Sequence, residues 1–289
     1  MRLNRIVLSA LSCVLAGSVL SPIAWANGPE AGPVGEAASE GPHATIVGGE
    51  KTTVAEWPFI IAGLREGGSR PRGQSCTASV IAPRVILTAG HCYDDDLPGK
   101  KSYVYGLDDF DSGEGFVTEV VDFERPPEYG SWSGGWDGAV VTVADDIPVK
   151  DGKFATFATS ADSDLTKPGA KGTAVGYGRT YDGDNETSAL KKAPIPVVED
   201  SQCSSVGGIS YDPETMYCGG GTPQNNICQG DSGGPHVIDG VITGITSWGV
   251  SGCQGVAGFA KLTGPLGDWV AEQVQQSEAL RAQEVNAQG

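Results

Sequence analysis

The residues best suited to chemistry are a serine in a glycine-rich turn and a histidine far upstream of it. Ser232 lies in the run 230–235 (Gly-Asp-Ser-Gly-Gly-Pro), and His91 lies in the run 88–92 (Thr-Ala-Gly-His-Cys). A serine hydroxyl is a weak nucleophile near neutral pH, so it needs a base within hydrogen-bond reach and an acid that orients that base. The pair therefore indicates nucleophilic catalysis.

His91 is the best candidate for the base. The chain has three histidines; His43 precedes the expected start of the mature domain, and His236 follows the serine by only four residues. Asp137 follows His91 by 46 residues and is the predicted acid.

The chain order of these residues separates three kinds of serine hydrolase. The run around Ser232 also fits the nucleophile elbow of α/β-hydrolases, but that fold places its acid and its histidine after the serine. Only His236 follows Ser232, and four residues leave no room for a strand and a loop to bring it back. The order Asp, His, Ser of subtilisins fails too, because the small-residue context of a subtilisin serine is absent. The order His91, Asp137, Ser232 is therefore the predicted one.

Several further motifs in the same order resemble the chymotrypsin/trypsin-like serine proteases. The resemblance covers about residues 46–275 and rests on the segments 46–49 (Ile-Val-Gly-Gly), 76–79, 88–92, 136–141, 216–218, 230–235 and 247–249 (Ser-Trp-Gly). One departure is the Trp-Asp-Gly-Ala context of Asp137, where the family usually has Asp-Ile-Ala-Leu.

The resemblance implies an all-β fold with two packed six-stranded antiparallel barrels, over about residues 46–155 and 156–262. Short β-branched runs separated by turn residues agree with an all-β chain. Leu266, Trp269, Val270 and Val274 share one face at helical spacing, which predicts a C-terminal helix. His91 and Asp137 would come from the first barrel and Ser232 from the second.

The resemblance also assigns roles to residues around the serine. The backbone N–H groups of Gly230 and Ser232 would form an oxyanion hole. Ser247, Trp248 and Gly249 would pair with the substrate backbone as an added strand.

Asn226 would stand at the base of the primary specificity pocket, where trypsins carry an aspartate. A neutral amide cannot compensate a buried cation, so an uncharged substrate side chain is expected. Gly249 and Gly258 would keep the pocket walls open to large residues, and Ile227 would shorten the pocket.

Ile46 carries an expectation of activation by cleavage. In the family, a new N-terminal ammonium pairs with the aspartate before the nucleophile, here Asp231. The precursor would therefore be a zymogen cut between Thr45 and Ile46, by another protease or by itself. Because Thr45 is neither Arg nor Lys, a trypsin-like activator is not expected.

The N-terminal segment has the features of a secretory signal. Arg2 and Arg5 precede an apolar stretch over 6–20, and Ala24-Trp25-Ala26 offers a cleavage site. Fifteen residues are too short for a transmembrane helix, so no stable membrane anchor is expected. We expect a signal peptide over 1–26, a pro-segment over 27–45, a protease domain over 46–275 and a polar, frayed tail over 276–289. A lipoprotein signal through Cys13 is the alternative.

The cysteines support an exported protein. Apart from Cys13, six of the seven cysteines remain, and an even number in an exported chain implies disulfides whose pairing sequence cannot choose. The family resemblance implies the pairs Cys76–Cys92, Cys203–Cys218 and Cys228–Cys253. No zinc site is expected, because no Cys-x-x-Cys occurs.

The chain is acidic, with a formal net charge of −17. Nucleic-acid binding is not expected, because phosphates require a basic face. The acidic runs 94–96 and 108–111 leave calcium binding open, although neither has EF-hand spacing. The sequence predicts a secreted, monomeric serine endopeptidase without a cofactor that acts on protein or peptide substrates. The alternatives are an inactive family member that only binds, and an esterase.

Overall fold

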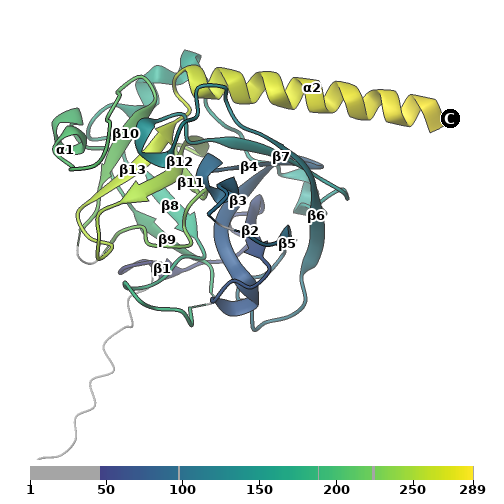
Figure 1. The fold of residues 1–289 in the computed structure, drawn as a ribbon, viewed down its shortest axis with the longest axis horizontal. Helices are drawn as coiled ribbons and strands as arrows, with labels where there is room; N and C mark the ends of the chain where they lie inside the picture. The colour runs from purple at the N-terminus through teal and green to yellow at the C-terminus, as the bar shows by residue number, and fades with distance from the viewer. Residues whose placement is uncertain (1–45, 97, 188, 223–224, 289) are drawn as a thin grey trace, which may run out of the picture. The chain divides into compact units, whose positions relative to one another are not determined.

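The structure, a computed structural model, describes residues 46–96, 98–187, 189–222 and 225–288. The predicted signal peptide and pro-segment therefore lie outside the described residues. The described chain is mostly β-structure (Figure 1). Its strands are β1 (Glu50–Lys51), β2 (Ile60–Arg65), β3 (Gln74–Ala82), β4 (Val85–Thr88), β5 (Lys101–Tyr105), β6 (Phe116–Glu124), β7 (Ala139–Val143), β8 (Thr173–Gly176), β9 (Lys191–Pro194), β10 (Met216–Gly220), β11 (Pro235–Ile238), β12 (Val241–Gly249) and β13 (Val256–Lys261).

The helices are few among the described residues. The α-helices are α1 (Asp200–Ser204) and α2 (Pro265–Gln288), and the 3₁₀ turns are η1 (Pro71–Gly73), η2 (Gly90–Tyr93), η3 (Trp132–Gly134), η4 (Lys150–Gly152) and η5 (Ser160–Thr166). None of the described helices is long and apolar enough to cross a membrane.

The first half forms a closed six-stranded barrel. Its strands follow the order β2-β3-β4-β7-β6-β5, and every pairing is antiparallel. β4 (Val-Ile-Leu-Thr) is buried at every position, as expected of a strand covered on both faces. The predicted first barrel is therefore confirmed, and its β4 leads directly into the turn that carries His91.

The second half differs in detail from the prediction of a six-stranded barrel. It is a seven-stranded antiparallel sheet in the order β1-β9-β8-β11-β12-β13-β10. The extra strand, β1, comes from the start of the region expected to form the first barrel, and Glu50 pairs with Lys192 of β9. Two exposed charged residues carry no strand pattern of their own, so their pairing depends on the tertiary fold.

α2 covers the end of the barrel with the face that its sequence predicts. Leu266 and Val270 are fully buried, and Trp269 and Val274 pack against the same core. Burial of a side chain of this size stabilises the fold by about 2 kcal/mol. The helix continues to Gln288, so it includes most of the segment 276–289 for which a frayed end was expected.

Candidate active site

His91 lies in η2, immediately after β4, and its position is fixed by tight packing. A Cβ on the preceding Gly90 would lie 3.0 Å from the Tyr129 ring and 3.1 Å from Gly138 O, so only glycine fits there comfortably. The next residue, Cys92, forms a disulfide with Cys76 of β3. The backbone that carries the imidazole is therefore held on both sides.

Asp137 lies just before β7 and is completely buried. It follows Trp136, whose φ of 58° is a left-handed conformation that a bulky residue seldom adopts. Such strain persists only where surrounding contacts determine it, and it is common at functional sites. Here the turn directs the Asp137 carboxylate toward η2.

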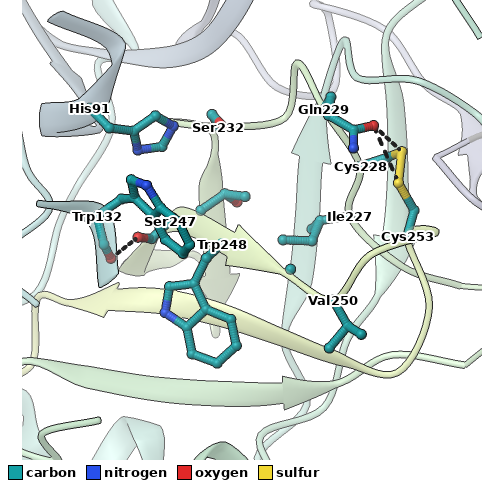
Figure 2. Close-up of a pocket in the computed structure, with 12 residues that line it drawn as sticks. His91, Trp132, Ile227, Cys228, Gln229, Ser232, Ser247, Trp248, Val250 and Cys253 are labelled. Atoms are coloured by element: carbon teal, nitrogen blue, oxygen red, sulfur yellow. Dashed lines mark hydrogen bonds between the residues drawn. A yellow bond between two sulfur atoms is a disulfide. The ribbon is translucent and has the colours of Figure 1, made fainter. Parts of the chain in front are cut away.

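His91 and Asp137 form a two-point contact. The His91 backbone N–H donates to Asp137 Oδ1 at 2.9 Å, and Nδ1 of the ring lies 2.7 Å from Oδ2. Ser247 Oγ also donates to Oδ2 and lies 3.4 Å from the Trp132 carbonyl (Figure 2). An ionised carboxylate only accepts, so Nδ1 carries a proton and Nε2 of neutral His91 is free to act as a base.

The pKa values of this pair shift apart. Burial lowers the pKa of His91, but the charge of Asp137 and its hydrogen bond raise it, and the net pKa lies above the ordinary value. Burial raises the pKa of Asp137, but the charge and hydrogen bonds of His91 and the hydrogen bond of Ser247 bring it below its ordinary value. The two groups therefore stabilise each other in the ionised state.

Ser232 lies in the turn before β11 and lines the same cavity as His91 (Figure 2). Its carbonyl accepts the Thr77 N–H at 2.8 Å, which ties the turn to β3 of the barrel. Within the described chain, the Ser232 hydroxyl and His91 Nε2 do not yet form a hydrogen bond with each other. Catalytic hydrogen bonds are often long before substrate binds.

The backbone N–H groups of this turn divide into two sets. Those of Asp231, Gly233 and Gly234 donate to Cys228 O, Thr246 O and Asp231 O at 3.0, 2.8 and 2.8 Å. Those of Gly230 and Ser232 have no acceptor within the part of the chain that the structure describes. Unpaired donors on the nucleophilic residue and two residues before it are available to an oxyanion.

Asp231 is a second buried carboxylate, and it lacks an ion pair among the described residues. It accepts the Gly178 N–H at 2.8 Å and the Cys228 N–H at 2.9 Å. Burial raises its pKa to about 6, although both N–H donors and the more distant charges of Arg70 and Lys191 lower it. A Cβ on Gly176 or Gly178 would lie 2.3 Å from this carboxyl group, so both glycines make room for it.

Ile46 is also buried, in the core cluster of the second sheet. Its backbone has a φ of 39°, and Asn226 N–H donates to the carbonyl of the next residue, Val47, at 3.0 Å. In the full chain the nitrogen of Ile46 belongs to a peptide bond and carries no charge. It therefore cannot form an ion pair with Asp231 in the uncut chain.

The cavity beside Ser232 has a volume of about 250 Å³ and a largely apolar wall. It is lined by His91, Trp132, Ile227, Cys228, Gln229, Ser232, Thr246, Ser247, Trp248, Gly249, Val250 and Cys253 (Figure 2). Sequence reasoning missed Trp132, Gln229, Thr246 and Val250; the only signal for Trp132 was a tryptophan inside the Gly/Ser-rich run 130–135.

Two residues expected at this pocket do not line it. Asn226 is fully buried: its amide nitrogen donates to Gly255 O at 3.2 Å, and its oxygen accepts the Ile227 N–H at 2.9 Å. Gly258 lies behind Trp248, whose ring would be 2.0 Å from a Cβ at position 258. Ile227, the residue expected to shorten the pocket, lines the cavity instead of Asn226.

Three disulfides surround these elements. They join Cys76 to Cys92, Cys203 to Cys218 and Cys228 to Cys253, and both cysteines of the last pair line the cavity. Among the described residues, no group of three or more His, Cys, Asp or Glu is placed to hold a metal ion. In the acidic run 94–96, Asp94 is engaged by Arg125 at 2.8 Å and by the Tyr129 hydroxyl.

Comparison with known proteins agrees with this geometry. The family model described as "Trypsin" matches residues 46–270. The chain is 34% identical to a trypsin of Saccharopolyspora erythraea over 79% of this chain and 98% of that protein. It superposes on the Vibrio cholerae VesB protease with a TM-score of 0.64, at 27% identity, over 80% of this chain and 68% of that one. Mouse neuropsin, a serine protease, shares the fold with a TM-score of 0.67, at 24% identity, over 78% of this chain and 98% of that one.

Proposed function

The chain belongs to the trypsin family and is a serine endopeptidase, and we propose that His91, Asp137 and Ser232 are its catalytic triad. The observation that carries this proposal is the contact between His91 Nδ1 and Asp137 Oδ2 at 2.7 Å. It commits one ring nitrogen to the acid and leaves Nε2 for the serine that lines the same cavity.

In this mechanism Ser232 Oγ attacks the scissile carbonyl and passes its proton to His91 Nε2. His91 then delivers the proton to the leaving amine, which breaks the peptide bond and leaves an acyl-enzyme. A water molecule then attacks the acyl-enzyme with His91 as the base, which frees Ser232 and releases the carboxylic acid product. Asp137 keeps the ring in the correct tautomer and stabilises the imidazolium throughout.

The oxyanion of each tetrahedral intermediate would be bound by Gly230 N–H and Ser232 N–H. These groups are unpaired among the described residues, while the other N–H groups of the turn are engaged, which supports this assignment. One such donor lowers the barrier by about 3 kcal/mol.

The substrate backbone would add to β12 at Ser247, Trp248 and Gly249. On one side this segment pairs with β13, through Trp248 with Gly258 and Gly249 with Ala257. On the other side the ladder with β11 ends at Ile245, opposite Pro235. An extended peptide can take the place of the missing partner strand.

The pocket favours an uncharged side chain before the scissile bond. Ile227, Trp248 and Val250 supply its apolar surface, and none of the described residues that line it is a carboxylate able to pair with Lys or Arg. Asn226 is not among the described residues that line the cavity, so the proposal rests on the lining residues rather than on Asn226. A buried Lys or Arg side chain would lose its hydration there without a partner.

The protein would be made as a secreted precursor. The three disulfides are typical of exported proteins. The signal peptide over 1–26, the pro-segment over 27–45 and the protease domain from 46 remain our proposed division. Cleavage between Thr45 and Ile46, by another protease or by the enzyme itself, would give the ammonium that Asp231 lacks. We further propose that the active enzyme is a monomer.

The first experiment is a panel of fluorogenic peptides on the form that begins at Ile46, with Ser232→Ala as the control. Cleavage after large neutral residues is expected. Cleavage after Lys or Arg would keep the mechanism and overturn the pocket. Absence of both cleavage and labelling by a serine-directed phosphonate would overturn the enzyme proposal in favour of a binding role.

N-terminal sequencing of the active protein should give Ile-Val-Gly-Gly. An active form that retains residues before Ile46 would contradict activation by this cut.

A further inference from the structure

Arg70 is a buried cation with an unusual set of partners. It lies in the loop between β2 and β3, just before η1, and only 7% of its surface is exposed. Within the described chain it forms no ion pair with a carboxylate. A buried guanidinium is costly unless hydrogen bonds compensate it, so its contacts need an explanation.

Three backbone carbonyls hold the guanidinium. Nη1 donates to Gln229 O at 2.7 Å, and Nη2 donates to Tyr177 O at 2.6 Å and to Thr187 O at 3.0 Å. Tyr177 immediately follows β8, and Gln229 immediately precedes Gly230 in the turn that leads to Ser232. Arg70 thus joins a loop of the barrel half to two segments of the sheet half.

The contact with Gln229 O fixes the direction of the next N–H group. In a planar trans peptide, the carbonyl of one residue and the N–H of the following residue point in opposite directions. Because Gln229 O faces Arg70, the N–H of Gly230 points away from it, and this is one of the two N–H groups of the 230–234 turn without an acceptor among the described residues. The Arg179 N–H also donates to Gln229 O, at 2.9 Å.

The following peptide is fixed as well. Gly230 O accepts the Gln74 amide at 2.9 Å and the Thr77 hydroxyl at 2.8 Å. Gly230 itself has a φ of 97°, and a Cβ there would lie 1.9 Å from Arg70 Nη1. The guanidinium therefore fills the space behind Gly230, and both peptides that flank this residue are held from the same side.

We propose that Arg70 is a positioning residue that holds the Gly230 N–H toward the scissile carbonyl. The inference rests on the proposed role of Gly230 in the oxyanion hole. Arg70 does not contact the substrate; it acts through the Gln229–Gly230 peptide. Without it, this peptide keeps only the Arg179 N–H and can rotate, so that one oxyanion donor is lost in part of the molecules.

The test compares Arg70→Met and Arg70→Lys with Arg72→Met in the activated enzyme. Arg72 is the matched control: it lies two residues away, is exposed, and donates to Gly113 O and Glu114 O in a loop between β5 and β6. The readouts are kcat, KM and the inhibition constant of a peptide aldehyde built on the best substrate of the panel. The aldehyde adds to Ser232 and places its oxygen in the oxyanion hole.

We expect Arg70→Met to lower kcat by about tenfold to a hundredfold, less than complete loss of one oxyanion donor, with KM within about twofold. The aldehyde should bind more weakly by a similar factor. Arg70→Lys should restore part of the loss, because it keeps the charge but offers a less suitable donor geometry. Arg72→Met should match the wild type.

Three results would overturn the proposal. Arg70→Met could equal Arg72→Met in kcat; the aldehyde could bind Arg70→Met as tightly as wild type; or Arg70→Lys could restore full activity, which would make Arg70 a simple countercharge for Asp231. If Arg70→Met does not fold, Arg70→Lys decides the question. Unchanged kcat and unchanged aldehyde binding in Arg70→Lys contradict the inference, whereas a parallel loss of kcat and of aldehyde affinity supports it. A wild type that neither cleaves peptides nor binds the aldehyde would overturn the proposed function, whereas an active wild type with unaffected Arg70 variants would overturn this inference alone.

Discussion

Asp137 and Asp231 are both buried carboxylates, yet their surroundings move their pKa values in opposite directions. Asp137 is 0% exposed and Asp231 is 1% exposed. Asp137 has a histidine in direct contact, and its pKa lies below the ordinary value. Asp231 has two backbone donors but no ion pair in the described chain, and burial raises its pKa to about 6.

The difference shows that folding alone brings a cation to Asp137 but brings none into contact with Asp231 among the described residues. Burial by itself disfavours a carboxylate, and a nearby cation or hydrogen bonds to the charged form must outweigh it. For Asp137 the cation is supplied by His91, 46 residues earlier in the same chain. For Asp231 we propose that it is supplied by the amine that cleavage before Ile46 would create.

The largest effect should come from removing the charge of Asp137, the carboxylate that contacts a histidine. Asp137→Asn would let Nδ1 accept a hydrogen bond from the amide, so that His91 adopts the wrong tautomer. We expect kcat to fall by about 10⁴-fold, the loss that this substitution causes in the general triad example, with little change in KM. Ser247→Ala removes only one hydrogen bond to Asp137 and should cost about fivefold. Steady-state kinetics with equal losses in the two variants would contradict the role of the Asp137 charge.

The next largest effect should come from removing the charge of Asp231. Asp231→Asn should lower kcat/KM of the cleaved enzyme by about 10²- to 10³-fold, because a buried ammonium would be left without its partner, a loss of about 3–4 kcal/mol. The uncut protein has no such ammonium, so its unfolding free energy should stay the same or increase. Kinetics of the cut form and denaturant unfolding of the uncut form measure the two effects. Full activity of the cut Asp231→Asn variant would rule out the proposed ion pair.

The pH dependence of stability should separate the uncut and cut forms. In the uncut form the folded pKa of Asp231, about 6, lies above the ordinary value of 3.8. The folded state then binds a proton more tightly, so stability is full below about pH 4 and is lost as the pH rises through 6. The loss amounts to about 3 kcal/mol at pH 7.

Cleavage should reverse this loss, because the new ammonium lowers the pKa of Asp231. Thermal unfolding of Ser232→Ala protein, uncut and cut, should give melting temperatures that diverge between pH 4 and 7. The buried His236, whose pKa burial lowers to about 4, destabilises both forms equally toward acid and therefore cancels in the difference. Parallel curves would argue against an ion pair at Asp231.

The smallest effect tests a third buried carboxylate, introduced by design. Asn226→Asp would keep the hydrogen bond from Ile227 N–H but would place an oxygen against Gly255 O, at a cost of about 1–3 kcal/mol in unfolding free energy. The new charge would lie one residue from Ile227, which lines the cavity, so its field should favour Lys and Arg substrates without direct contact. A peptide panel in which preference for neutral residues persists unchanged would show that a charge at position 226 does not act on the substrate.

The parts of the site that could be predicted from sequence are those fixed by local turns. Ser232 and His91 each lie in a short run whose glycines, and in the His91 run a cysteine, fix the backbone turn. The motif therefore predicts both the turn and the reactive side chain that the turn carries. The buried face of α2 follows from the helical spacing of its apolar residues. These features depend on neighbours in the sequence, whereas the barrel is implied by the family resemblance, with which the short β-branched runs agree.

The features that sequence did not predict depend on distant contacts. β1 is a strand only because Glu50 and Lys51 meet β9. Ile227 rather than Asn226 faces the cavity because Asn226 is held by Gly255. The role of Arg70 is a third example, since nothing near it in sequence indicates that its partners are the carbonyls of Tyr177, Thr187 and Gln229.

The hydroxyl of Ser247 has a consequence for spectroscopy. Ser247 belongs to the segment of β12 on which a substrate strand would pair, and it donates to the same Asp137 oxygen that contacts His91 Nδ1. A peptide bound along β12 would perturb that oxygen without touching it. The magnetic resonance of the proton between His91 and Asp137 should therefore shift when a peptide occupies the strand, even in a Ser232→Ala protein that cannot react. The chemical shift of this proton would therefore report how much of the enzyme has a bound peptide in the absence of turnover.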